Sequence, residues 1–142
     1  MPTTTMDPPA PSSRPPQGRP ARVLYAEDLP DLRELMRLNL LRSGFQVETV
    51  GDGGAALQRL RAGPAEIDLL ITDHQMPGMN GLDLVRSLRL LPYQGKVMVY
   101  ASELDPEVNH TYRRLGVHVI LAKPVRPALL RRVVETLLPA AR

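Results

Sequence analysis

The stretch that decides the fold runs from residue 69 to residue 81 and reads Leu69-Leu70-Ile71-Thr72-Asp73-His74-Gln75-Met76-Pro77-Gly78-Met79-Asn80-Gly81. An apolar run ends in a carboxylate, and turn-forming residues follow before apolar periodicity resumes at Leu82. This pattern predicts a buried strand, a loop and a helix, with Asp73 at the carboxyl end of the strand. In an open α/β sheet, that end of a parallel strand borders the crevice where ligands bind. A single Asp at a strand end is more often a helix cap or a solvated turn residue, so its interpretation depends on the rest of the chain.

Strand and helix signals alternate through the rest of the sequence. We expect strands over residues 23–26, 47–50, 68–72, 96–100 and 117–122, with the second strand alternating beside solvent. Helices are predicted over residues 30–41, 55–60, 82–90, 106–115 and 127–138, with Asp105 capping the fourth. Because parallel strands need helical, right-handed crossovers, the predicted fold class is α/β. The expected architecture is a flavodoxin-like doubly wound parallel sheet of five strands, in the order 2-1-3-4-5, with five helices.

The first 21 residues differ in composition from the rest. They hold seven of the fifteen prolines and have no apolar periodicity, which predicts a disordered tail over 1–21 and one domain over 22–142. The net charge of +3 is small and spread along the chain, so nothing calls for nucleic-acid binding. Cysteine is absent, and no apolar run approaches the ~20 residues of a membrane span. The expectation is a soluble cytoplasmic protein without a membrane segment.

Charged side chains follow the first, third and fifth predicted strands, which we expect to be neighbours in the centre of the sheet. They are the acidic pair Glu27-Asp28, then Asp73, then Lys123. Carboxylates packed together raise one another's pKa, which favours a cation among them, and a few oxygen ligands suit Mg²⁺. A nucleophilic carboxylate, a divalent metal and a lysine are the equipment for moving a phosphoryl group onto Asp73. Each residue alone has a plainer role as a helix cap or a loop charge.

Three segments together carry a resemblance to a known family. They are Val23-Leu24-Tyr25-Ala26-Glu27-Asp28, the stretch from Asp73 to Gly81, and Lys123-Pro124. Over residues 22–140 the sequence resembles the receiver domain of two-component response regulators, of the stand-alone type with no effector domain.

The resemblance implies a role for each site residue. Asp73 would be the phosphoacceptor, and Lys123 would contact the phosphoryl oxygens. Asp28 and Asp73 would bind Mg²⁺ with the backbone carbonyl of Gln75, and Glu27 would hold a metal-bound water. The resemblance also implies a cis bond between Lys123 and Pro124. The donor would be a phosphohistidine on a sensor histidine kinase or a histidine phosphotransfer protein. Such a domain is a signalling phosphoacceptor, not an enzyme beyond its own phosphotransfer and slow dephosphorylation.

Some positions depart from the family pattern. Receivers usually end the fourth strand with Thr or Ser, but a gap-free count places Ala101 there and Ser102 one residue later. A slip of one residue would give the role to Ser102 and would exchange the faces of the strand. The usual aromatic residue before the lysine is Ile120, and the usual Phe after Lys-Pro is Val125.

These departures leave two hypotheses. In the first, Asp73 accepts phosphate and the chain signals through protein contacts, but the link from Asp73 to the face formed by the fourth helix, fifth strand and fifth helix is altered and relies on Tyr100 or Ser102. That face is also a candidate homodimer interface. In the second, the chain is a pseudo-receiver, an interaction module that never takes phosphate. A carboxylate-nucleophile phosphatase is disfavoured because Gln75 stands where such enzymes need a second Asp.

Overall fold

Five strands form a single parallel sheet in the computed structural model, which describes residues 19–138. The strands are β1 (Arg22–Ala26), β2 (Gln46–Val50), β3 (Leu69–Thr72), β4 (Lys96–Ala101) and β5 (Val119–Ala122). Their order is β2-β1-β3-β4-β5, and every neighbouring pair is parallel, so the predicted fold class and strand order are confirmed. The expectation that the first, third and fifth strands are neighbours in the centre of the sheet is wrong. Strand β5 lies at the edge, and β4 separates it from β3.

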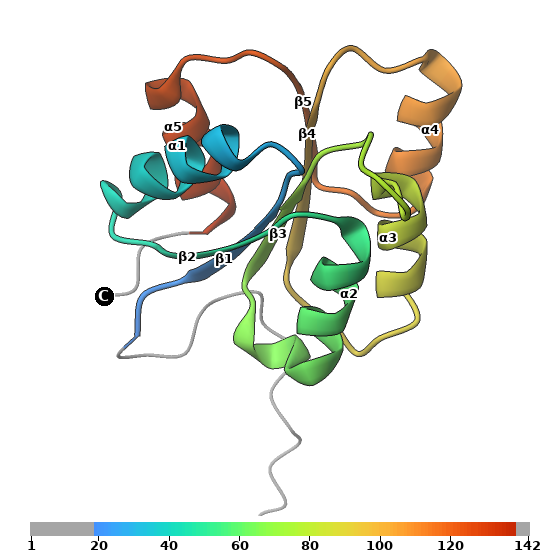
Figure 1. Cartoon of the computed structure of the whole chain (residues 1–142), viewed down its shortest axis with the longest axis horizontal. Helices are drawn as coiled ribbons and strands as arrows, with labels where there is room; N and C mark the ends of the chain where they lie inside the picture. The colour runs from blue at the N-terminus through green and yellow to red at the C-terminus, as the bar shows by residue number, and fades with distance from the viewer. Residues whose placement is uncertain (1–18, 139–142) are drawn as a thin grey trace, which may run out of the picture.

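Five helices cover the two faces of this sheet (Figure 1). The helices α1 (Pro30–Leu41) and α5 (Pro127–Leu137) lie on one face. On the other lie α2 (Gly53–Ala62), α3 (Gly81–Leu88) and α4 (Pro106–Arg114), and a 3₁₀ turn, η1 (Pro64–Glu66), follows α2. Between residues 19 and 138, no helix has the length and apolar character needed to cross a membrane.

Two hydrophobic cores result, one on each face of the sheet. In β1, Val23 and Tyr25 pack with α1 and α5, whereas Leu24 and Ala26 pack with α2 and α3. Since both faces of the central strands are covered, these strands are mainly apolar, and all four residues of β3 are buried. The edge strand β2 is half-buried after its first residue, instead of alternating between buried and exposed positions.

Two details at the ends of α4 differ from what the sequence predicts. Strand β5 begins two residues later than expected because Val117 donates its N–H to the Tyr112 carbonyl (3.2 Å) and so completes the end of α4. Gly116 makes that ending possible with a φ of 80°. At the other end, Asp105 occupies the N-cap position, but its side chain makes no capping hydrogen bond. The helix starts at Pro106, whose fixed φ suits the first helical position.

Packing at the amino-terminal edge begins before residue 22. Ala21 is buried and accepts a hydrogen bond from the Gln46 N–H (2.9 Å). Arg19 pairs with the nearly buried Asp68 at 3.1 Å, and Asp68 also accepts from the Arg22 N–H (2.7 Å). Residues 1–18 of the predicted tail lie outside the described residues.

Candidate functional site

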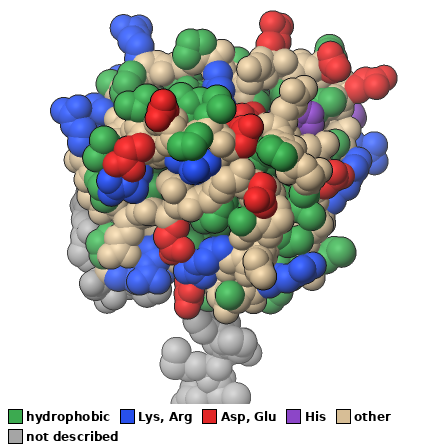
Figure 2. All heavy atoms as spheres, in the orientation of Figure 1, with side chains coloured by type: hydrophobic (Ala, Val, Ile, Leu, Met, Phe, Trp, Pro, Cys, Tyr) green, Lys and Arg blue, Asp and Glu red, His purple; other side chains and the backbone are tan. Residues whose placement is uncertain are grey.

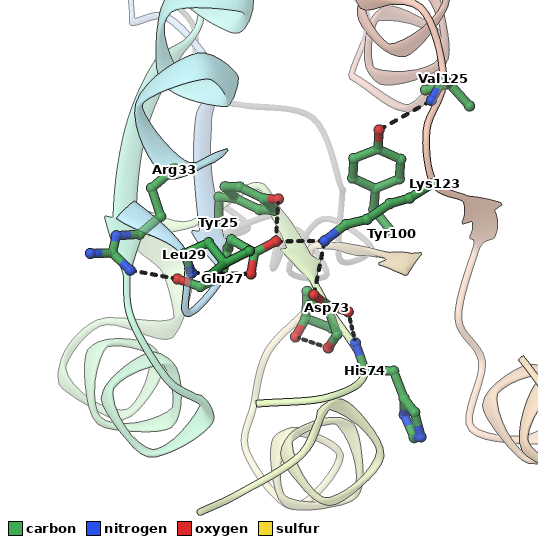
Figure 3. Close-up of polar contacts among 10 residues, drawn as sticks. Tyr25, Glu27, Leu29, Arg33, Asp73, His74, Tyr100, Lys123 and Val125 are labelled. Carbon is green, nitrogen blue, oxygen red and sulfur yellow. Dashed lines mark hydrogen bonds and ion pairs between the residues drawn. The ribbon is translucent and has the colours of Figure 1, made fainter. Parts of the chain in front are cut away.

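The predicted acids and the lysine meet at the carboxyl edge of the sheet, where Figure 3 shows Lys123 between Glu27 and Asp73. The ammonium of Lys123 lies between two carboxylates, 2.5 Å from Oε1 of Glu27 and 2.8 Å from Oδ2 of Asp73. Lys123 directly follows the edge strand β5, so its side chain extends past the end of β4 to reach them. On the way its Nζ lies 5.5 Å from the centre of the Tyr100 ring. The peptide bond between Lys123 and Pro124 is cis, as the resemblance implied.

The three acidic residues form one cluster. Glu27, Asp28 and Asp73 each contribute a carboxylate oxygen, and these oxygens lie within 4.8 Å of one another. The side chain of Glu27 is 0% exposed. It accepts hydrogen bonds from the Tyr25 hydroxyl and from the Leu29 N–H, both at 3.3 Å. One cation and two further hydrogen-bond donors offset the cost of removing the Glu27 carboxylate from water.

The electrostatics of the cluster favour an added cation. Burial acts to raise the pKa of Glu27, but the hydrogen bond from Lys123 and its charge outweigh it and lower that pKa overall. Burial likewise acts to lower the pKa of Lys123, and its bonds to Asp73 and Glu27 raise it overall. A hydrogen bond shared with Glu27, followed by partial burial and charge repulsion, raises the pKa of Asp28. Three carboxylates and one ammonium leave a formal charge of minus two, so this all-oxygen donor set fits a hard divalent ion.

A polar crevice lies beside Asp73 on the side of α4. Its volume is about 440 Å³, and its lining includes Gln75, Ala101, Ser102 and Glu103. The register pairs Ala101 with Ala122, the residue before Lys123, which agrees with the gap-free count. Ala101 is 2% exposed and ends β4 with a methyl group. The exposed Ser102 brings a hydroxyl to the same crevice.

A second cavity, of about 480 Å³, lies between α1 and the start of α5 and was not predicted from the sequence. Its walls are mainly apolar and include Leu32, Leu35, Met36 and Leu130, with Lys123 and Ser102 at the end nearest Asp73. Tyr100 also lines it, and its hydroxyl accepts a hydrogen bond from the Val125 N–H at 3.2 Å. The cavity depends on the spacing of two helices far apart in sequence, which no local pattern encodes.

The position of His74 was also not anticipated. Its backbone N–H donates to Oδ1 of Asp73 at 2.6 Å, so both oxygens of Asp73 have a partner. Its ring points away from the acidic cluster (Figure 3) and bonds to the hydroxyl of Tyr112 on α4. The sequence around Tyr112 gives no sign of this partner.

Comparison with known proteins agrees with this architecture. A family model described as "Response regulator receiver domain" matches residues 23–135. The two-component response regulator ORR11 of Oryza sativa subsp. indica is 32% identical over 124 residues, which cover 86% of this chain and 84% of that protein. The sensory/regulatory protein RpfC of Xanthomonas campestris pv. campestris (strain 8004) is 32% identical over 116 residues, which cover 79% of this chain. The chain spans only 16% of the length of RpfC.

Solved structures show the same fold. The chemotaxis protein CheY4 of Vibrio cholerae superimposes with a TM-score of 0.75 and 28% identity, covering 84% of this chain and 99% of that one. A response regulator receiver protein from Pseudomonas putida gives a TM-score of 0.77 and 29% identity, covering 84% and 98%. The fold is thus that of CheY-like receiver domains. The chain belongs to the response regulator receiver domain family of two-component systems.

Proposed function

We propose that this chain takes a phosphoryl group from a phosphohistidine onto Asp73 and signals through contacts with other proteins. The observation that carries the proposal is the bridge from Lys123 to Asp73 and Glu27, which fixes one carboxylate at the mouth of the crevice and buries the other. The side chain of Asp73 is 14% exposed, so an incoming phosphorus atom has access to it. A family of phosphoacceptor signalling domains supplies the context.

The chemistry requires little from the protein beyond positioning and charge. A carboxylate oxygen of Asp73 attacks phosphorus, the bond from phosphorus to the donor imidazole nitrogen breaks, and the imidazole leaves with that electron pair. The ammonium of Lys123 is placed to pair with a phosphoryl oxygen once the group has arrived. Ser102 is the nearest hydroxyl offered by the end of β4, so we assign it the hydrogen bond that Ala101 is unable to make.

The acidic cluster suits Mg²⁺. Asp28 and Asp73 would bind it directly with the backbone carbonyl of Gln75, and Glu27 would hold one of its waters. A bound Mg²⁺ would neutralise charge that develops on the transferring phosphoryl group. The net negative charge of the cluster supports this assignment, because three carboxylates share one ammonium.

The donor partner would be a sensor histidine kinase or a histidine phosphotransfer protein. Its imidazole must reach Asp73, so the partner has to cover the rim of the crevice. Leucines are exposed on α1, and one of them, Leu35, at 63% exposed, lines the second cavity, which shares Ser102 with the crevice. In contrast, acidic and basic side chains are interspersed over much of the molecular face that Figure 2 shows. An apolar α1 surface beside the crevice supports docking of a partner there.

The proposal is tested by incubation with a small acyl phosphate and Mg²⁺, followed by intact-mass measurement. We expect an increase of one phosphoryl group that is lost in Asp73→Asn and on chelation of the metal. The matched control is Asp83→Asn, because Asp83 is an exposed aspartate in the first turn of α3. A wild-type protein that gains no mass would instead support the pseudo-receiver hypothesis, which the buried methyl of Ala101 and the presence of Ile120 in β5 motivate.

A further inference from the structure

We propose that the hydrogen bond between His74 and Tyr112 is a positioning link through which α4 responds to the chemical state of Asp73. This inference rests on the proposed function, because it concerns the effect of loading Asp73. It gives α4 a direct connection to the phosphoacceptor that does not pass through the end of β4.

The link is a short chain of two hydrogen bonds. Oδ1 of Asp73 accepts from the His74 N–H at 2.6 Å, and Nδ1 of the same histidine lies 2.6 Å from the hydroxyl of Tyr112. The two rings meet edge to face, with centroids 5.5 Å apart and an angle of 81° between their planes. Tyr112 has no exposed surface and lies within α4, so its ring moves only with that helix.

The buried hydroxyl of Tyr112 is the second partner in this link. Burial, and secondarily the charges of Asp73 and Asp83, raises the pKa of the Tyr112 hydroxyl well above its usual value. The hydroxyl therefore keeps its proton at neutral pH and forms one hydrogen bond with Nδ1 of His74, in which the histidine tautomer decides which group donates. This hydrogen bond and the edge-to-face ring contact hold His74, whose backbone N–H binds Asp73, against α4.

Close packing leaves Asp73, His74 and Tyr112 little room to move independently of one another. The Gly81 N–H donates to the His74 carbonyl at 2.7 Å, which closes the loop that follows Asp73. A Cβ atom at position 81 would lie 2.6 Å from the Tyr112 hydroxyl oxygen and even nearer to the Asp73 carbonyl oxygen. Because the space between these groups is too small for one methyl group, a displacement of Asp73 or His74 has to be taken up by Tyr112.

Loading Asp73 changes what the link holds. A phosphoryl group on Asp73 turns one of its two hydrogen-bonded carboxylate oxygens into the bridging oxygen of an acyl phosphate and brings new anionic oxygens near the His74 N–H. The two states of Asp73 thus make different contacts with His74, which is the condition for shifting an equilibrium of α4. Ala101 offers no hydroxyl that could transmit the same change from the end of β4.

The test is hydrogen exchange of the α4 backbone amides, compared with and without beryllofluoride and Mg²⁺. Beryllofluoride mimics a phosphoryl group on a carboxylate, and intact native mass shows when each protein is fully loaded. The decisive variant is Tyr112→Phe, which removes one hydroxyl and keeps the ring. The control is Tyr93→Phe, since Tyr93 is also buried in the same core and its hydroxyl donates to the Lys96 carbonyl at 2.8 Å, away from the site.

We expect loading to change α4 exchange in the wild type and in Tyr93→Phe, and the change to fall to less than a third in Tyr112→Phe. A second variant, His74→Phe, removes the ring nitrogens and must give the same loss, which keeps the test valid if Tyr112→Phe does not fold. An unchanged response in either variant of the link, or an equal loss in Tyr93→Phe, overturns the inference. Failure of the wild type to load overturns the proposed function itself, and the mass measurement identifies that case separately.

Discussion

Lys123 holds together two carboxylates that belong to different strands: its ammonium lies 2.5 Å from the fully buried Glu27 and 2.8 Å from Asp73. A buried carboxylate requires a partner because its charged form is poorly solvated. The residue proposed to meet the phosphoryl group therefore also stabilises the apoprotein. Function and stability are linked at this residue.

The first prediction concerns that dual role. Lys123→Met leaves Glu27 without its cation, so we expect the free energy of unfolding in metal-free buffer to fall by about 3 kcal/mol, as when one partner of a buried ion pair is removed. Urea titration measures the change. Lys96→Met, at the opposite end of the sheet, is the control and should change stability by less than about 1 kcal/mol. A Lys123→Met protein as stable as the wild type would show that Glu27 is not buried as an anion.

The second prediction concerns the metal. Asp28→Asn removes one of the crowded carboxylates, so we expect the metal-free protein to become more stable and to lose the stabilisation that Mg²⁺ gives. In the wild type, Mg²⁺ at ten times its dissociation constant should add roughly 1.4 kcal/mol, since it binds the folded state only. Thermal unfolding at several Mg²⁺ concentrations measures both effects. Equal stabilisation of the variant and the wild type would place the ion elsewhere.

The third prediction concerns pH. His118 accepts a hydrogen bond from the Val97 N–H through Nδ1 at 3.1 Å, and partial burial, then the nearby charges of Lys96 and Arg89, lowers its pKa. In the unfolded chain, His118 takes up a proton near pH 6.5, whereas in the folded protein it stays neutral at that pH. The unfolded state therefore binds more protons than the folded state just below that pH. Stability is therefore complete above about pH 6.5 and falls as the pH drops toward the lowered pKa.

The variant that checks this is His118→Asn, whose side-chain oxygen is able to accept the same bond. We expect a flatter stability profile between pH 7 and pH 5 than in the wild type, measured by urea unfolding at each pH. His110→Asn, at an exposed position of α4, is the control and should keep the wild-type slope. Identical slopes in His118→Asn and the wild type would contradict the assignment.

The fourth prediction concerns the hydroxyl in the crevice. Ser102→Ala removes the hydrogen bond that we assign to the loaded state, so the initial rate of phosphorylation by an acyl phosphate should fall roughly tenfold, equivalent to one ordinary hydrogen bond. Ser87→Ala, on α3, should leave the rate unchanged. If Ser102→Ala also reacts at the wild-type rate, neither residue at the end of β4 supplies a hydroxyl to the phosphoryl group.

Much of the fold is encoded locally and could be predicted. Apolar runs mark the strands because both faces of the sheet are covered, and proline or glycine marks most helix ends. The cluster of Glu27, Asp28, Asp73 and Lys123 followed from strand order, even though Lys123 comes from the edge strand and not from a central neighbour. The lysine side chain is long enough to reach Glu27 and Asp73 from the edge of the sheet, so the predicted cluster still forms.

The features that were missed depend on distant packing. The bond between His74 and Tyr112 joins residues 38 positions apart, and each looks ordinary in its own segment. The hydrogen bond from the Tyr25 hydroxyl to Glu27 was missed for the same reason. It forms because Tyr25 is buried in the core beneath α1 and α5, and the buried carboxylate of Glu27 lies within reach of its hydroxyl. The start of β5 was placed too early because the end of α4 uses Val117.

Site-resolved mass spectrometry of the acyl-phosphate-treated protein in the presence of Mg²⁺ tests the central claim most directly. The account predicts one phosphoryl group, located by fragment ions at Asp73 and released by hydroxylamine as expected for an acyl phosphate. A phosphoryl group on any other residue, or none under conditions that label a known receiver domain in parallel, would contradict it.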